Sequence, residues 1–199
     1  MTLNEILKPY QLILGSASPR RQQLLRELGL NFSIKTADTE EHAPANFDGF
    51  ETAIHIAKEK AAALSGGLVP ENILITADTE VWQNKQRFGK PENLTQARKM
   101  LLQLSGNVHK VISGVCFTTD TKQHCFSVAT DVYFRKLTHS EIDYYLQHGN
   151  PLDKAGAYGI QEWIGLVGIE RIEGSYTNVV GMPMTEFYTE LEQFITSLT

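Results

Sequence analysis

Apolar residues along the chain follow strand-like and helix-like patterns in turn. Leu12–Leu14 is a short apolar run followed by leucines at helical spacing, and the front half of Asn72–Trp82 is almost uniformly apolar, as in a central strand. Between these, Ala53, Ile56 and Ala57 share one face of a helix. The predicted strands are 12–14, 31–36, 72–82, 109–118, 123–134 and 166–172. The predicted helices are 18–28, 49–64, 93–104, 138–146 and a C-terminal helix that opens at Pro183.

Two long segments with period-two alternation predict a hairpin around Thr119–Lys122. Strands and helices alternate before it, so the expected fold class is α/β, with a mixed sheet flanked by helices. A length of 199 residues suits one domain over 1–199, or two small lobes that share a core.

The composition excludes several classes of protein. The chain is 42% hydrophobic and 21% charged, as in ordinary globular proteins, and its net charge of -5 argues against general nucleic-acid binding. No apolar run approaches the ~20 residues of a membrane span. Met1–Pro9 lacks the apolar core of a signal peptide, so we expect a cytoplasmic protein. In that setting Cys116 and Cys125, which face each other across the predicted hairpin, are expected to be reduced thiols.

Three stretches carry candidate chemistry. In the first, a small-residue loop leads into a helix that Ser18 caps, and Arg20 and Arg21 lie in its first turn, where the helix dipole disfavours cations. Local rules are often broken at functional sites, and two guanidiniums beside free N–H groups suit a phosphate chain. The alternative is a solvated arginine pair on a surface helix.

The second stretch joins a lysine to a strand carboxylate. Lys60 falls in the middle of the apolar face of its helix, so it either extends to solvent or points into a polar cleft. Asp78 interrupts an apolar strand near its end, with Thr76 and Glu80 on the same side. A carboxylate there is costly to bury without a partner, which indicates a catalytic or metal-binding group; a structural salt bridge is the alternative.

The third stretch, Asp153–Gln161, is dense in small residues and polar side chains. Its glycines and alanines permit close approach of a ligand, whose polar edges Asp153, Lys154, Tyr158 and Gln161 would then read. The alternative is a turn-rich connector.

Five segments in this order resemble the Maf family of nucleotide pyrophosphatases. They are Gly15–Arg21 (GSASPRR), Ala77–Thr79 (ADT), Gly89–Pro91 (GKP), Asp153–Gln161 (DKAGAYGIQ) and Gly174–Pro183 (GSYTNVVGMP). The resemblance implies a two-lobed α/β fold like that of inosine triphosphate pyrophosphatases, with a groove for a nucleoside triphosphate. It implies hydrolysis between the α- and β-phosphates, and the DKAGAYGIQ form is similar to the branch that acts on dTTP and UTP.

The resemblance also assigns residues. Asp78 matches the catalytic acid or base, and Arg20, Thr79 and Gln161 match positions linked to substrate choice. The residues expected to hold the phosphates are Ser16, Arg21, Lys60 and Lys90. Asp78 and Glu41 are the oxygen ligands expected for Mg²⁺ or Mn²⁺, with Co²⁺ as a further choice. Whether Asp78 binds the metal or deprotonates water is open.

Glu80 departs from the family pattern, which has an apolar residue there, so the number of carboxylates at the metal is open. A homodimer fits the family. Two other functions are kept as alternatives: a pyrophosphatase for other non-standard nucleotides, and a nucleotide-binding regulator of cell division.

Overall fold

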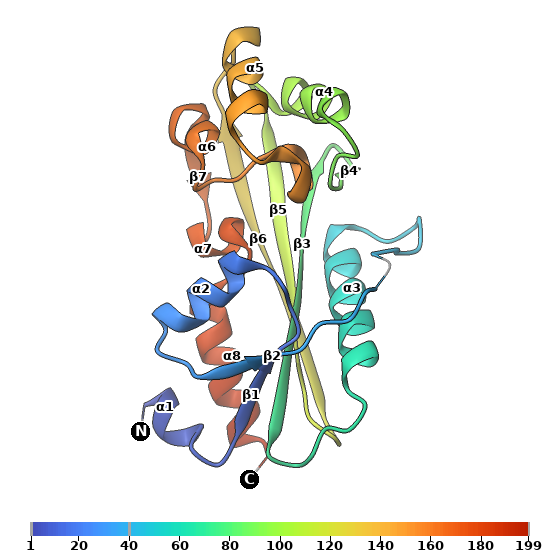
Figure 1. Ribbon diagram of the computed structural model, residues 1–199, viewed down its shortest axis with the longest axis vertical. Coiled ribbons are helices and arrows are strands. Elements are labelled where there is room, and N and C mark those ends of the chain that lie inside the picture. Colours follow the sequence, from blue (N-terminus) through green and yellow to red (C-terminus); the bar gives the residue numbers. More distant parts are fainter. Residues whose placement is uncertain (1, 40, 199) are drawn as a thin grey trace.

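A seven-stranded mixed sheet forms the centre of the molecule (Figure 1). The computed structural model describes residues 2–39 and 41–198. The strands are β1 Gln11–Leu14, β2 Phe32–Ile34, β3 Asn72–Gln83, β4 Gln86–Phe88, β5 Val108–Thr118, β6 Gln123–Phe134 and β7 Ile169–Glu173. Their order is β2-β1-β3-β5-β6-β7, with β4 paired to β3. Because β1 runs parallel to β2 and β3 while the other pairs are antiparallel, the predicted mixed α/β class is confirmed.

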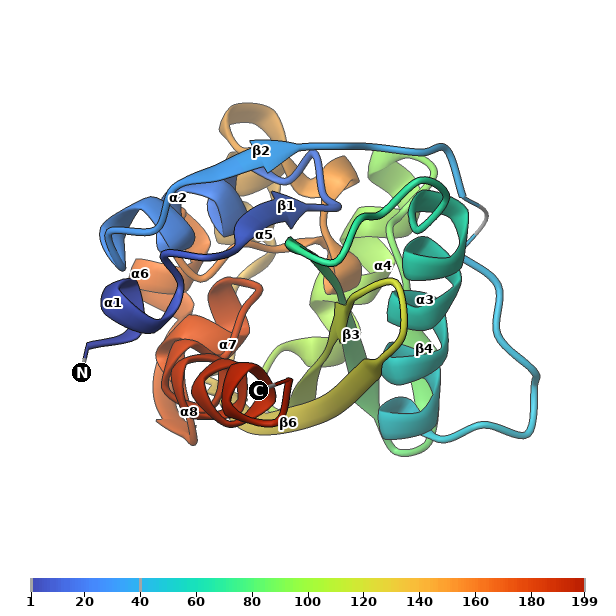
Figure 2. The same ribbon diagram turned by 90° about the horizontal axis from the view of Figure 1, so that it is seen from below.

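Helices cover both faces of the sheet (Figures 1 and 2). They are α1 Leu3–Ile6, α2 Pro19–Glu27, α3 Gly49–Leu64, α4 Leu94–Leu104, α5 His139–His148, α6 Trp163–Gly168, α7 Tyr176–Val180 and α8 Met184–Thr196, with 3-10 turns at Pro151–Asp153 and Ala155–Ala157. The helix α3 lies against β3 and β5, and α8 packs on the other side of β5. Gly114 permits the first contact, because a Cβ there would lie 2.5 Å from the Ala53 carbonyl.

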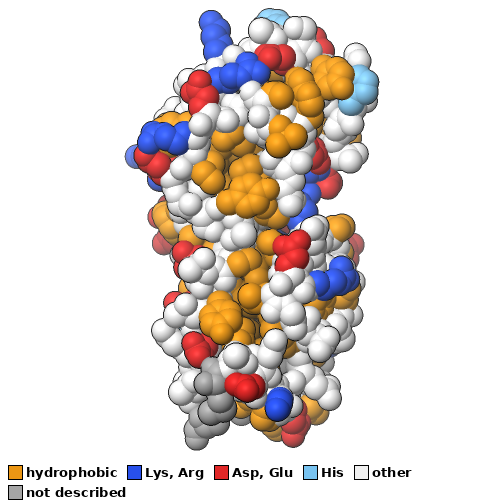
Figure 3. All heavy atoms as spheres, turned by 90° about the vertical axis from the view of Figure 1, so that its left-hand side faces the viewer, with side chains coloured by type: hydrophobic (Ala, Val, Ile, Leu, Met, Phe, Trp, Pro, Cys, Tyr) orange, Lys and Arg blue, Asp and Glu red, His pale blue; other side chains and the backbone are white. Residues whose placement is uncertain are grey.

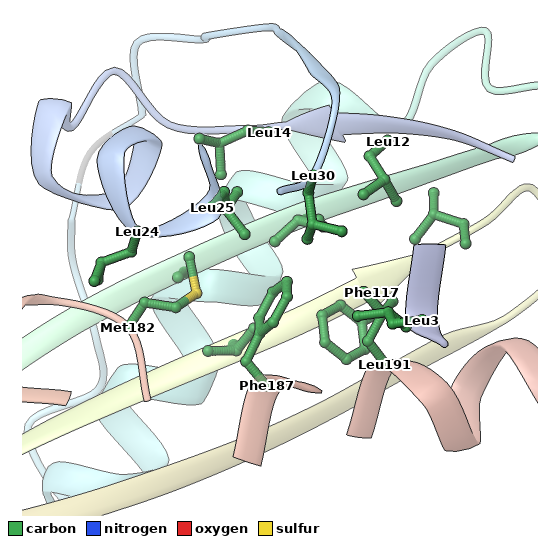
Figure 4. Close-up of a cluster of buried hydrophobic side chains, with 14 of the residues drawn as sticks. Leu3, Leu12, Leu14, Leu24, Leu25, Leu30, Phe117, Met182, Phe187 and Leu191 are labelled. Carbon is green, nitrogen blue, oxygen red and sulfur yellow. The ribbon is translucent and has the colours of Figure 1, made fainter. Parts of the chain in front are cut away.

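The buried hydrophobic residues form two main clusters, one toward each end of the long strands. In the first, Phe187 and Leu191 of α8 lie beneath Leu25 of α2 and beside Phe117 of β5 (Figure 4). The second lies beneath α4 and α5, where Leu101 and Tyr145 are among the buried side chains. The two clusters lie along one continuous sheet.

The predicted strand at 166–172 is wrong in its first half. The chain forms the helix α6 up to Gly168, and β7 begins only at Ile169. Helical spacing buries Ile164 and Gly168 and leaves Leu166 exposed. Because a short apolar run fits a strand and a helix equally well, the pattern alone selected the wrong element.

The expectation of two reduced thiols is also wrong. Cys116 and Cys125 are joined in a disulfide, with their Cα atoms 4.1 Å apart. They occupy directly opposed positions of β5 and β6, which brings the two sulfur atoms together. The expectation of reduced thiols came from the expected cytoplasmic location. The distance between the two sulfur atoms is instead determined by the register of β5 and β6.

Within residues 2–39 and 41–198, none of the helices combines the length and the apolar character needed to cross a membrane.

Candidate active site

The structure brings all nine predicted site residues to one cleft of about 920 Å³. The nine are Ser16, Arg20, Arg21, Glu41, Lys60, Asp78, Thr79, Lys90 and Gln161. The cleft is of a size usual for small-molecule sites. Residues far apart in the sequence therefore form one surface, although their individual roles stay predictions.

The loop after β1 and the middle of β3 form the floor of the cleft. The strand β1 pairs with the first half of β3, so Gly15 and Ser16 follow β1 directly beside Thr76. A Cβ at Gly15 would lie 2.6 Å from the Thr76 side chain, which explains why glycine begins this loop. Because side chains alternate along β3, Asp78 points to the α3 side and Thr79 to the α2 side.

Arg21 is held entirely by protein groups. Its Nε donates to the Gly181 carbonyl at 2.9 Å, NH2 donates to Thr79 Oγ1 at 2.9 Å, and NH1 donates to Ser16 Oγ at 3.3 Å. Burial lowers the pKa of Arg21, and the nearby Asp78 opposes that shift. These bonds join α2 to β3 and to the end of α7, so Arg21 stabilises the fold whatever it also does for a ligand. Neighbouring Arg20 is more exposed and lies 3.6 Å from an Asp153 carboxylate oxygen.

Lys60 points into the cleft, which settles the alternative between the cleft and solvent. Its Nζ lies 2.7 Å from Asp78 Oδ1 and 3.0 Å from Glu41 Oε1. Lys90 binds the same Glu41 at 2.8 Å. Although burial opposes the change, the two ammonium groups lower the pKa of Glu41 to about 2. A chain of alternating charges therefore runs from Asp78 to Lys90.

Arg87 is a cleft residue that the sequence did not identify. Its Nε and NH2 atoms donate to the two carboxylate oxygens of Glu80 at 2.6 and 2.7 Å. Burial and the adjacent Asp78 raise the pKa of Glu80, and the guanidinium opposes this shift. The sequence feature that could have identified Arg87 is Glu80, because a carboxylate buried in a strand requires a cationic or hydrogen-bonding partner. Because β3 and β4 form a hairpin, that partner comes from the returning strand.

The loop 153–161 lines the cleft, so the alternative of a connector outside the site is wrong. Gly156 and Ala157 both have left-handed backbone, with φ of 70° and 63°. Lys154 is buried, and its Nζ contacts the Asn150 carbonyl at 2.6 Å and carboxylate oxygens of Asp153 and Glu162 at 2.7 and 2.6 Å. Gln161 is exposed within the cleft.

Tyr158 differs from its predicted role of reading the polar edge of a ligand. The tyrosine is 5% exposed, and its hydroxyl lies 2.7 Å from His109 Nε2 beneath the loop. Its ring packs against Phe134 at a centroid distance of 4.9 Å. Tyr158 therefore supports the loop from inside, and His109 is a supporting residue that the sequence did not identify.

The donor groups present suit a hard divalent cation. Asp78 and Glu41 both reach the Lys60 ammonium, so the two carboxylates converge on one small region. Carboxylate oxygens are the ligands that Mg²⁺ and Mn²⁺ prefer. Outside Met1, Glu40 and Thr199, which the structure does not describe, no group of three or more His, Cys, Asp or Glu side chains could hold an ion. A metal at Asp78 would therefore need further ligands from the substrate or from water.

Comparison with known proteins points to one family. The family model described as "Maf-like protein" matches residues 11–194. A relative in Bacteroides fragilis is 49% identical over 188 residues, covering 94% of this chain and 97% of the relative. One in Phocaeicola vulgatus is 48% identical over 190 residues, covering 95% and 98%, and one in Flavobacterium johnsoniae is 42% identical over 193 residues, covering 97% and 100%. All three are named dTTP/UTP pyrophosphatase. The motifs, the fold and these relatives agree, and the chain belongs to the Maf family.

Proposed function

We propose that this protein is a nucleoside triphosphate pyrophosphatase that hydrolyses dTTP and UTP to the monophosphate and diphosphate. The observation that carries the proposal is the single cleft in which Asp78 lies among Arg20, Lys60 and Lys90. The names of the relatives support the same activity and the same two nucleotides.

The charges in the cleft suit attack of water on a phosphoanhydride bond. A triphosphate is a strong polyanion, and its cleavage is fast only when cations neutralise it and hold the reacting groups in line. Lys60 and Lys90 supply that charge, and both are held by Glu41 in the structure. Asp78, fixed by Lys60, either deprotonates the attacking water or binds the cation; in both roles it must be ionised.

A divalent metal is the cofactor we propose, held by Asp78 and Glu41. Mg²⁺ or Mn²⁺ fits these oxygen ligands, and Co²⁺ is a further candidate. When bound, such an ion withdraws negative charge from the phosphate oxygens. Lys60 forms ion pairs with both carboxylates, so at least one of these ion pairs would have to lengthen if the ion binds between them.

Base choice is assigned to Gln161, whose amide offers both a donor and an acceptor, as do the edges of uracil and thymine. The test is a substrate panel with Mg²⁺ or Mn²⁺, following release of diphosphate. We expect kcat/KM for dTTP and UTP to exceed that for CTP, ATP and GTP by about tenfold or more, and Gln161→Ala to reduce that preference. Equal use of purines and pyrimidines by the wild type would refute the base preference while leaving the pyrophosphatase activity in place.

We further propose a homodimer in the cytoplasm. Exposed apolar side chains support self-association: Leu166 is 77% exposed, and Trp163 and Tyr144 lie in ring contact beside it. Hydrophobic side chains gather on the upper half of the face shown in Figure 3, on the side where Figure 1 places α6. Light scattering of the wild type and of Leu166→Asp tests the dimer, and cell fractionation tests the location.

A further inference from the structure

Arg87 is fixed at the edge of the cleft by a buried carboxylate. The Glu80 side chain is 4% exposed and that of Arg87 is 33% exposed. The carboxylate binds one edge of the guanidinium through two short hydrogen bonds. A bidentate pair of this kind sets the plane of the guanidinium as well as its position.

Among residues 2–39 and 41–198, the other edge of the guanidinium makes only long contacts. NH1 and NH2 both lie 3.5 Å from the Glu41 carbonyl, which is the long limit of a hydrogen bond. Arginine has five N–H donors, and Glu80 uses only two of them in short bonds. Arg87 lines the cleft and its side chain is 33% exposed, so the guanidinium borders the space that a ligand would occupy.

Three cations from separate positions converge on Glu41. Lys60 comes from α3 and Lys90 from the segment after β4, and both bind the Glu41 carboxylate; Arg87 of β4 borders the Glu41 backbone. The Glu41 carboxylate occupies the point where the two lysines meet, and the Arg87 guanidinium lies beside the Glu41 main-chain carbonyl. A phosphate group would find the same charge there, and arginine matches phosphate geometry with paired N–H donors.

Packing does not by itself explain the Glu80–Arg87 pair. A well-packed apolar pair stabilises a fold as well as a buried ion pair or better, because the ion pair must first be desolvated. Glu80 lies two residues from Asp78 on the same side of β3, and its buried carboxylate is joined to Arg87 by two short hydrogen bonds. The pair therefore holds a cation in a fixed position at the cleft. Binding of an anionic substrate would offset the free energy lost in desolvating the pair.

We propose that Arg87 binds the phosphate chain of the nucleotide and that Glu80 is the positioning residue that orients its guanidinium. This rests on the proposed function for the identity of the ligand. It adds a cation to the phosphate-binding residues and gives Glu80 a purpose that does not involve the metal.

The molecule contains a matched control. Arg98 and Asp143 form the same bidentate pair at 2.8 and 3.0 Å, and the Arg98 side chain is 34% exposed, but neither residue lines the cleft. The affinity for inorganic pyrophosphate is measured by calorimetry for wild type, Arg87→Met, Arg87→Lys, Glu80→Gln and Arg98→Met. The affinity for uridine is measured on the same proteins.

We expect Arg87→Met to weaken pyrophosphate binding about tenfold or more, with Arg87→Lys intermediate and Arg98→Met within about twofold of wild type. Glu80→Gln should weaken it as well, and uridine affinity should be unchanged throughout. If Arg87→Met does not fold, Glu80→Met/Arg87→Met removes both charges together and serves in its place.

Wild-type pyrophosphate affinity in Arg87→Met, or an equal loss in Arg98→Met, would overturn the assignment of Arg87. An effect of Arg87→Met without an effect of Glu80→Gln would overturn the positioning role of Glu80. Since the assay requires no turnover, a protein that hydrolyses neither dTTP nor UTP would refute the proposed function and leave the pyrophosphate result readable.

Discussion

At the scale of the residue, Asp78 is the group on which the proposed chemistry depends. Asp78 follows a mostly apolar stretch of β3 and is 5% exposed, and its carboxylate forms an ion pair with Lys60. Its substitution by asparagine keeps the size of the side chain and removes the charge. Lys60 retains Glu41 as a partner, so the change should affect the reaction more than the fold.

We therefore expect Asp78→Asn to lower kcat/KM for dTTP by about 100-fold or more, with a melting temperature within a few degrees of wild type. Asp131→Asn is the control, because Asp131 pairs with Lys110 and neither residue lines the cleft. Steady-state assays and thermal melts on both variants provide the measurement. If Asp78→Asn retains activity within a few-fold of wild type, the Asp78 carboxylate has no catalytic role.

His109 gives a second prediction at this scale, on pH and stability. Burial lowers the pKa of His109 to about 4, and Asp131 weakly opposes the shift, while the Tyr158 hydroxyl faces the ring. Between pH 6.5 and 4 the unfolded chain binds a proton that the folded protein does not. Stability must therefore fall as the pH drops through this window, by on the order of 3 kcal/mol in total.

His109→Gln retains a polar partner for Tyr158 and cannot titrate, so its stability should fall less between pH 6.5 and 4.5. Urea unfolding at several pH values provides the measurement. Carboxylates also titrate in this range, among them Glu80, whose pKa burial raises, but both proteins carry them, so the difference between the two curves isolates the histidine. Parallel stability curves for the two proteins would contradict the prediction.

At the scale of the element, adjacent arginines in the first turn of α2 have different environments. Pro19 begins the helix and Ser18 caps it through the Arg21 backbone N–H. The Arg21 side chain then crosses to Gly181 after α7 and to Thr79 of β3. Arg20 makes one long ion pair at the surface of the cleft.

Arg21→Ala should lower the free energy of unfolding by about 3 kcal/mol, because it leaves buried hydrogen-bond partners unsatisfied. Arg20→Ala should lower it by less than about 1 kcal/mol. If Arg20 contacts the substrate, as the family resemblance implies, it should instead change KM. Chemical denaturation together with kinetics on both variants tests this, and equal loss of stability in the two would contradict it.

At the scale of the whole molecule, the cleft is built from segments that only the folded chain brings together. Its lining residues come from α2, α3, β3, β4, β5 and the loop 153–161, together with the segments 15–18, 36–39, 41–42, 89–92 and 179–181. A ligand that bridges them can bind the native state but not the unfolded chain. Binding must therefore stabilise the protein by mass action.

We expect dTTP at 100 times its dissociation constant to raise the stability of the Asp78→Asn protein by about 2.7 kcal/mol. This variant is chosen because it should not consume the ligand. Thermal melts across a dTTP titration measure the effect, with dGTP at the same concentrations as the comparison. A melting temperature that does not depend on dTTP would show that the Asp78→Asn protein does not bind it, which would contradict this prediction.

The sequence alone determined the main elements and nine of the residues that line the cleft, but not Arg87. Period-two and helical spacing located β3, α3 and the β5–β6 hairpin, because each is long and buries a continuous face. The quoted motifs contain seven of the nine predicted cleft residues, and the family resemblance added Glu41 and Lys60, which lie outside those motifs. The short α6 was missed because a few apolar residues do not distinguish a helix from a strand.

Tertiary structure alone decided which partner each polar group has. Lys60 faces the cleft rather than solvent because Asp78 and Glu41 lie beneath α3. Cys116 meets Cys125 because the hairpin register places them opposite each other, and Arg87 is in the cleft because β4 returns beside Glu80. Spacing along a chain fixes which way a side chain points from its own element. What it meets there depends on segments distant in sequence, and packing brings those together.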